Sequence, residues 1–190
     1  MRRVKTKIRL TRGGKMAQNI GEFLTNRARR DTDLEAIYEP ATGSRLSYRD
    51  LNERSNQVAH SLKDLGVTKG DRVGLLLMNG KEFVETFFAV AKIGAVNVPL
   101  NWRLVADELE FILDDAGATV LLFSEEFAEL ASELRSRGDK TQISNWVQVG
   151  GETTDGALDY DDWMGSSSAT EPEIEGGGDD LVFIMYTSGT

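Results

Sequence analysis

The chain contains no cysteine, and this absence excludes disulfide bonds and thiolate metal sites. A sequence without cysteine is compatible with a reducing compartment, so we expect a cytoplasmic location. The chain also contains a single histidine, His60, which excludes any metal site built from two histidines. We expect His60 to lie on a helix, at the surface or partly buried, and to take no part in catalysis. No metal ligand is assigned in this chain.

Long hydrophobic runs are absent as well. No run of about 18 apolar residues occurs, which argues against a membrane span. With 40% hydrophobic and 28% charged residues, the composition is typical of a globular fold. A chain of 190 residues is long enough for one well-packed domain or for part of a larger protein. Nothing in the composition points to one oligomeric state.

Acidic residues are missing from the first fifteen positions, MRRVKTKIRLTRGGK, which hold seven of the 22 basic residues. Without them the net charge falls from −9 to −16. A basic arm can bind nucleic acid or target a mitochondrion. We favour a disordered tail or an upstream misreading for residues 1–15, because Met16 begins MAQNIGEFL, which is typical of a natural start. The acidic remainder repels phosphate, so no nucleic-acid partner is expected.

The segment that begins at Ser47 has the periodicity of an amphipathic helix. Ser47 suits the N-cap and Gly66 suits the C-terminal stop. The residues that recur at steps of three and four are Leu51, Ser55, Val58, Leu62 and Leu65. Before this helix, EAIYE and SRLSY flank PATG, a pattern that predicts a hairpin.

Strands and helices then alternate along the chain. The predicted strands are RVGLLLM, AVNVPL, TVLLF and NWVQVG. The predicted helices between them are KEFVETFFAVAKIG, ADELEFILDDAG and EEFAELASELRSR. Such alternation predicts an α/β fold with a mostly parallel sheet flanked by helices. On the second of these helices, the acidic residues are expected to form a solvated face; they are Asp107, Glu108, Glu110, Asp114 and Asp115.

Residues 165–178, GSSSATEPEIEGGG, lack apolar periodicity and are interpreted as a surface linker. The apolar run LVFIMY then predicts a buried strand, and TSGT is the loop at its C-terminal end. Ligands of open α/β sheets bind at the carboxyl ends of the strands.

The loop of Thr187, Ser188, Gly189 and Thr190 offers three hydroxyls and closely spaced backbone N–H groups. Glycine permits close approach to an anion, so this loop has the groups needed to hold a polyphosphate. A solvated turn is the alternative for so short a motif. It is not a Walker A loop, and no G-x-G-x-x-G follows a strand, so a Rossmann dinucleotide site lacks its main requirement.

Five motifs occur in a fixed order: SYRDLN, KGDRV, AKIGAVNVPLNWRL, ELEFILDDA and YTSGT. In this order and spacing the chain resembles the N-terminal region of the AMP-forming acyl-CoA synthetases, from about Asn19 to Thr190. The resemblance implies that residues 16–190 are a partial N-terminal AMP-binding (adenylation) domain, an incomplete part of the large domain of the acyl-adenylate-forming fold. YTSGT resembles the opening of the family's ATP phosphate loop, so the chain looks truncated within that loop.

The resemblance implies a ligase that uses ATP, Mg²⁺ and coenzyme A. A carboxylic acid, expected to be a fatty acid, would attack the α-phosphate of ATP to give an acyl adenylate, and the thiol of coenzyme A would then displace AMP. Thr187, Ser188, Gly189 and Thr190 are the implied phosphate-binding residues. The family's phosphate-loop lysine, its Mg²⁺ glutamate and its C-terminal domain would all follow Thr190. No catalytic residue is therefore assigned here, and we expect the chain alone to be inactive.

Other readings remain open at this point. The acid could be an amino acid or an aryl acid, as in an adenylation domain or an aryl-CoA ligase. A non-catalytic α/β module that binds a nucleotide or a partner is an alternative of a different class. An NAD-dependent oxidoreductase is disfavoured because the glycine fingerprint is missing.

Overall fold

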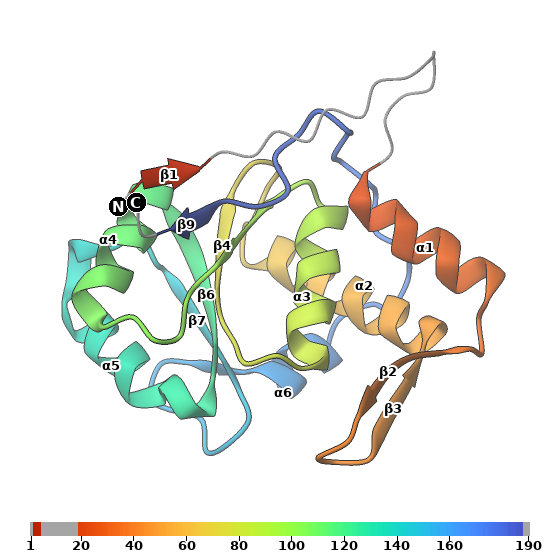
Figure 1. Ribbon diagram of the computed structural model, residues 1–190, viewed down its shortest axis with the longest axis horizontal. Helices are drawn as coiled ribbons and strands as arrows, with labels where there is room; N and C mark the ends of the chain where they lie inside the picture. The colour runs from red at the N-terminus through yellow and green to blue at the C-terminus, as the bar shows by residue number, and fades with distance from the viewer. Residues whose placement is uncertain (1, 5–18, 188–190) are drawn as a thin grey trace.

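The computed structural model describes residues 2–4 and 19–187 (Figure 1). The α-helices are α1 (Ile20–Arg30), α2 (Tyr48–Asp64), α3 (Lys81–Lys92), α4 (Ala106–Ala116), α5 (Ala128–Ser136) and α6 (Tyr160–Gly165). The strands are β1 (Arg2–Val4), β2 (Glu35–Glu39), β3 (Ser44–Ser47), β4 (Arg72–Leu76), β5 (Val96–Pro99), β6 (Ala118–Ser124), β7 (Asn145–Val149), β8 (Leu158–Asp159) and β9 (Met185–Thr187). The predicted α/β class is confirmed.

The main sheet in the described residues has five strands in the order β5-β4-β6-β7-β8, and all its neighbours are parallel. After β4 the chain first adds β5 on one side and then crosses to add β6 on the other side. The chain therefore reverses its winding direction between β4 and β6, and this is the switch point at which open α/β sheets bind ligands.

Helices cover both faces of this sheet. Helices α2, α3 and α6 pack on one face, against residues such as Val73 and Leu75, and α4 and α5 pack on the other, against Leu76 and Leu121. Side chains alternate between the faces along a strand, so both sets come from the same strands. Gly74 of β4 lies under α4: a Cβ at this position would stand 2.9 Å from a terminal methyl of Leu121 and 3.0 Å from one of Leu113, so a larger residue would require these side chains to shift.

The predictions at the start of the domain are confirmed. EAIYE and SRLS form the antiparallel hairpin β2–β3. Ser47 caps α2, because its side chain accepts a hydrogen bond from the backbone N–H of Asp50 while the Asp50 carboxylate accepts one from the backbone of Ser47. Gly66, just after α2, has φ of 85°, a left-handed conformation that suits glycine.

The predicted strand LVFIMY is formed only in part. Phe183 makes a single parallel bridge to Asn97 of β5, and Ile184 is buried, but Met185 is 46% exposed. Asn97 donates to the carbonyl of Val182 and accepts from the N–H of Ile184. The next donor in this ladder would be residue 99, which is proline and has no N–H, so pairing with β5 stops there.

Beyond this bridge the chain pairs elsewhere. Strand β9 is antiparallel to β1, with Val4 opposite Met185 (Figure 1). Of the predicted disordered arm, residues 2–4 form β1, whereas residues 1 and 5–15 lie outside the described residues. None of the helices among the described residues is long and apolar enough to cross a bilayer.

Candidate functional site

The predicted phosphate loop falls at the limit of the described residues. Ser188, Gly189 and Thr190 lie outside them, and Thr187 is the exposed last residue of β9. The neighbouring Tyr186 hydroxyl donates a hydrogen bond to the carboxylate of Asp115, in the last turn of α4. Because α4 ends just before β6 begins, Thr187 lies near the edge where the parallel strands start, not at the carboxyl edge expected for a loop that binds a ligand. Phosphate binding by these four residues remains a prediction.

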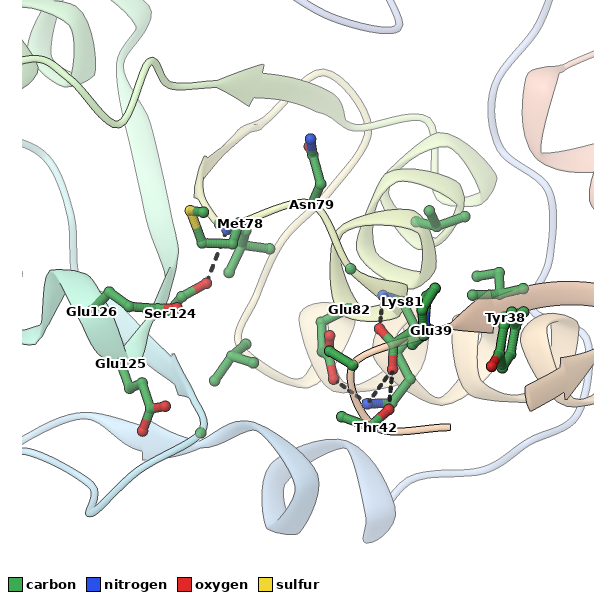
Figure 2. A pocket seen from close by; sticks show the side chains of 18 residues that line it. Tyr38, Glu39, Thr42, Met78, Asn79, Lys81, Glu82, Ser124, Glu125 and Glu126 are labelled. Atoms are coloured by element: carbon green, nitrogen blue, oxygen red, sulfur yellow. Dashed lines mark hydrogen bonds and ion pairs between the residues drawn. The ribbon is translucent and has the colours of Figure 1, made fainter. Parts of the chain in front are cut away.

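A pocket of about 730 Å³ lies at the opposite, carboxyl edge of the sheet (Figure 2). It opens at the switch point, between Leu77, which follows β4, and Ser124, which ends β6. The turn of the β2–β3 hairpin and the start of α3 complete its wall. Thr187 is not part of this lining, so the structure does not bring the predicted loop to the pocket.

Local hydrogen bonds shape the wall of the pocket. The backbone N–H of Met78 donates to Ser124 Oγ at 3.0 Å, which joins the ends of β4 and β6. Gly80 is the N-cap of α3 and brings no capping side chain, and the Glu39 carboxylate of the hairpin accepts from the Lys81 N–H at 3.0 Å instead. The hairpin thus caps a helix that is distant in sequence, at the terminus where a carboxylate is favourable.

The described lining of this pocket is acidic. Lys81 Nζ lies 2.5 Å from the Glu82 carboxylate and 3.7 Å from that of Glu39. Burial opposes the charge of Lys81, but the hydrogen bond and the charge of Glu82, with the nearby Glu39, raise its pKa. Glu125 and Glu126 stand on the other side of the pocket (Figure 2). Four carboxylates against one ammonium favour a cationic or neutral polar group over a free polyphosphate.

Metal chemistry has no support in this part of the chain. Within residues 2–4 and 19–187, no group of three His, Cys, Asp or Glu side chains is placed to hold an ion. The described residues therefore provide no site with three such ligands for Mg²⁺.

Sequence reasoning missed the residues that line the pocket, Lys81, Ser124 and Glu39 among them. One signal was available for two of them: Ser124 ends a predicted strand and Lys81 begins a predicted helix, and the sheet rule places both at the carboxyl edge. No such signal exists for Glu39, because the residue that it contacts, Lys81 of α3, is 42 positions away in the sequence. The predicted solvated face of α4 is confirmed for Asp107, Glu108, Asp114 and Asp115, which are exposed, whereas Glu110 is partly buried and pairs with Arg137 at 2.9 Å.

Comparisons with known proteins address the chain as a whole. The family model described as AMP-binding enzyme matches residues 24–190. The long-chain-fatty-acid–CoA ligase FadD13 of Mycobacterium tuberculosis is 41% identical over 174 residues, which are 91% of this chain and 33% of that protein.

Solved structures agree with this match. A fatty acyl CoA synthetase from Mycobacterium tuberculosis superposes with a TM-score of 0.81 at 40% identity, covering 90% of this chain and 32% of that one. The anthranilate CoA ligase AuaEII, solved with anthranoyl-AMP, gives a TM-score of 0.86 at 30% identity, with 92% and 33% covered. This chain thus spans about a third of the length of these relatives. By its sequence and its fold, the chain belongs to the family of AMP-binding enzymes.

Proposed function

We propose that this chain is the N-terminal part of the large domain of an ATP-dependent, AMP-forming ligase that joins a carboxylic acid to coenzyme A. The observation that carries the proposal is the 41% identity to a long-chain-fatty-acid–CoA ligase over 91% of the chain. A fatty acid is the acid we favour, because feruloyl-CoA synthases are only 34% identical over a similar span. We place the ligase in the cytoplasm, in keeping with the lack of cysteine.

The first step of such a ligase has a demanding charge balance. An anionic carboxylate approaches an anionic phosphate, and the transition state gathers further negative charge on the phosphate oxygens. In our proposal, Thr187, Ser188, Gly189 and Thr190 contribute hydroxyl and backbone N–H donors to the phosphates of ATP. These are dipoles rather than full charges. In our proposal, the positive charge comes from Mg²⁺ and from a lysine in the remaining two thirds of such an enzyme.

The chain alone is therefore expected to form no acyl-CoA. Loss of one preorganised donor in an active site costs about 3 to 4 kcal/mol of transition-state stabilisation, and here a lysine and a metal ligand would both be missing. Purified chain incubated with ATP, Mg²⁺, coenzyme A and a fatty acid should give no thioester. Thioester formation would contradict the proposal that the catalytic groups lie in the remaining two thirds of such an enzyme.

Isothermal titration with ATP separates this proposal from the alternative of a nucleotide-binding module. We expect no micromolar binding, since Thr187 is exposed and the pocket of about 730 Å³ at the carboxyl edge of the sheet is acidic. Micromolar binding of ATP by the isolated chain would favour the module.

A further inference from the structure

Residues 166–176, called here the strap, lie within the segment 165–178 that the sequence predicts to be a surface linker. The strap contains no helix or strand. It nevertheless follows a defined course, from α6 past α2 and α1 toward β9 (Figure 1). Of these eleven residues, all of which the structure describes, only Pro172 is buried. Apolar burial therefore contributes little to its placement, and polar contacts must decide it.

One polar face of α2 holds the first half of the strap. Asn56 Nδ2 donates to the carbonyl of Ala169 at 2.9 Å, and His60 Nε2 lies 3.0 Å from the carbonyl of Thr170. Ser61 Oγ donates to Ser167 Oγ at 2.7 Å. This face of α2 is therefore a docking surface for the strap rather than a solvated face.

The strongest contact is an ion pair with a buried lysine. Lys92, the last residue of α3, has no exposed side-chain surface, and its Nζ donates to Asn52 Oδ1 at 2.8 Å and to Asn56 Oδ1 at 2.5 Å. These amides are neutral, and the counter-charge comes from Glu171 of the strap at 2.5 Å. A buried ammonium without an anion is strongly unfavourable, so this ion pair favours the docked strap over a detached one.

Glu171 is the point where three helices meet the strap. Its carboxylate also accepts from Thr25 of α1 and, at 3.1 Å, from Asn52 of α2. The other ion pair of the strap, between Lys63 and Glu175, is more than a third exposed on each side and is expected to contribute little. Arg29 of α1 is a further positive charge that acts on Lys92.

The strap leads directly into the segment that pairs with β5. The N–H of Glu175 donates to the carbonyl of Lys92 at 3.2 Å, and Lys69 pairs with Asp180 at 2.7 Å. Val182 and Ile184 then bond to Asn97. The contacts of the strap thus determine where residues 181–187 begin to run along β5.

We propose that the Lys92–Glu171 pair is a latch: it fastens the strap to α1, α2 and α3 and so sets the position of residues 181–187. When the latch is broken, the strap and this segment detach together while the parallel sheet stays folded. The consequence for phosphate binding rests on the proposed function, because it requires residues 187–190 to contact ATP. The latch itself is argued from contacts alone.

Hydrogen exchange of the purified chain, read by mass spectrometry, tests the latch. In Glu171→Gln we expect the hydrogen-bonded amides of the strap and of residues 181–187, those of Glu175 and Ile184 among them, to exchange roughly 10- to 100-fold faster, as for the loss of a charged hydrogen-bonded pair. The amides of β4, β6 and β7 should keep their rates. Glu173→Gln is the matched control, since it removes the same charge from an exposed side chain of the same strap and should change nothing.

Lys92→Met provides a second variant in case Glu171→Gln, which leaves an unpaired buried ammonium, fails to fold. It should loosen the same two segments. Equal protection of the strap in wild type and in a folded latch variant would overturn the proposal, and so would faster exchange of the sheet to the same extent. Since no nucleotide is present, this result is independent of the ATP titration.

Discussion

At the residue scale, the sequence pattern could not predict that α3 buries two charged side chains, Glu85 and Lys92. The helical periodicity of KEFVETFFAVAKIG predicts that Phe83, Phe87, Val90 and Ala91 face inward. Val90 and Ala91 are buried, but the two phenylalanines are only partly so, and Glu85 and Lys92 are completely buried. Their partners are 31 and 79 positions away, so no local signal marks them.

Glu85 joins α3 to α2 and α6. Its carboxylate accepts from Arg54 Nε at 2.6 Å and from the Tyr160 hydroxyl at 2.8 Å. Burial is the main cause that raises the pKa of Glu85, although Arg54 and Tyr160 oppose the shift, and burial likewise raises the pKa of Tyr160. The carboxylate therefore depends on its two donors for its charge.

We predict that Glu85→Ala lowers the free energy of unfolding by about 3 kcal/mol, at the low end for a broken buried pair, because Arg54 and the buried Tyr160 hydroxyl lose their acceptor while Arg54 still reaches Asp161. Urea denaturation measures the loss. Asp161→Ala is the control: Asp161 is 80% exposed, and its removal should cost less than about 1 kcal/mol. Equal effects of the two changes would contradict the role given to Glu85.

The strap should respond to acid through Glu171. Burial opposes its ionisation, yet hydrogen bonds from Lys92, Thr25 and Asn52 outweigh this and lower its pKa. A lowered pKa means that the contribution of Glu171 is present at neutral pH and is lost as the pH falls through the folded-state pKa, in the acid range below the ordinary pKa of a glutamate. Burial lowers the pKa of Lys92, although Glu171 opposes this shift. Lys92 is already protonated at acid pH, so it adds no acid transition of its own.

We therefore predict that protection factors of residues 166–176 fall in this acid range, measured by hydrogen exchange corrected for intrinsic rates. Global stability is a poor readout, because the raised pKa of Glu85 acts with the opposite sign and stabilises the fold as Glu85 takes up a proton. Glu171→Gln should show no such acid step. The same step in that variant would assign it to another group.

At the scale of elements, local signals were sufficient wherever a helix or strand is specified by its own residues. The periodicity of α2, the hairpin residues before it and the short apolar strands all predicted elements that the structure contains. The segments 165–178 and 181–186 were harder, because the first is placed by contacts with three helices and the second by the missing N–H of Pro99. Contacts between residues so far apart in the sequence leave no periodic pattern from which the position of these two segments could be predicted.

The cap of α2 gives a prediction at this scale. Ser47→Ala removes the side chain that accepts from the N–H of Asp50 and should destabilise the domain by about 1 kcal/mol. The pKa of Asp50 is lowered by its hydrogen bonds to Ser47, so the effect should be largest at neutral pH. Thermal denaturation measures the change, and Ser47→Thr, which keeps a hydroxyl that accepts from the Asp50 N–H and donates to the Asp50 carboxylate, should stay near wild type. A loss as large in Ser47→Thr would argue against the cap.

At the scale of the molecule, the sequence predicted the parallel sheet and the family, and both are confirmed. The pocket at the switch point was missed, since it forms only when the β2–β3 hairpin folds against the start of α3. The opposite holds for the predicted phosphate loop, residues 187–190. Its sequence motif is easily recognised, but only Thr187 lies in the described residues. A motif can be recognised from a few adjacent residues, whereas a pocket is lined by residues that only the fold brings together.

The central claim, that this chain is the N-terminal part of an AMP-forming acid–CoA ligase, is tested most directly by a chimera. Residues 19–190 would replace the matching third of the Mycobacterium tuberculosis ligase FadD13, with the parent protein as control. The measurement is ATP-dependent formation of AMP and acyl-CoA from a long-chain fatty acid. We predict that both products form. A chimera that is folded by circular dichroism and binds ATP, yet releases neither product, would contradict the claim.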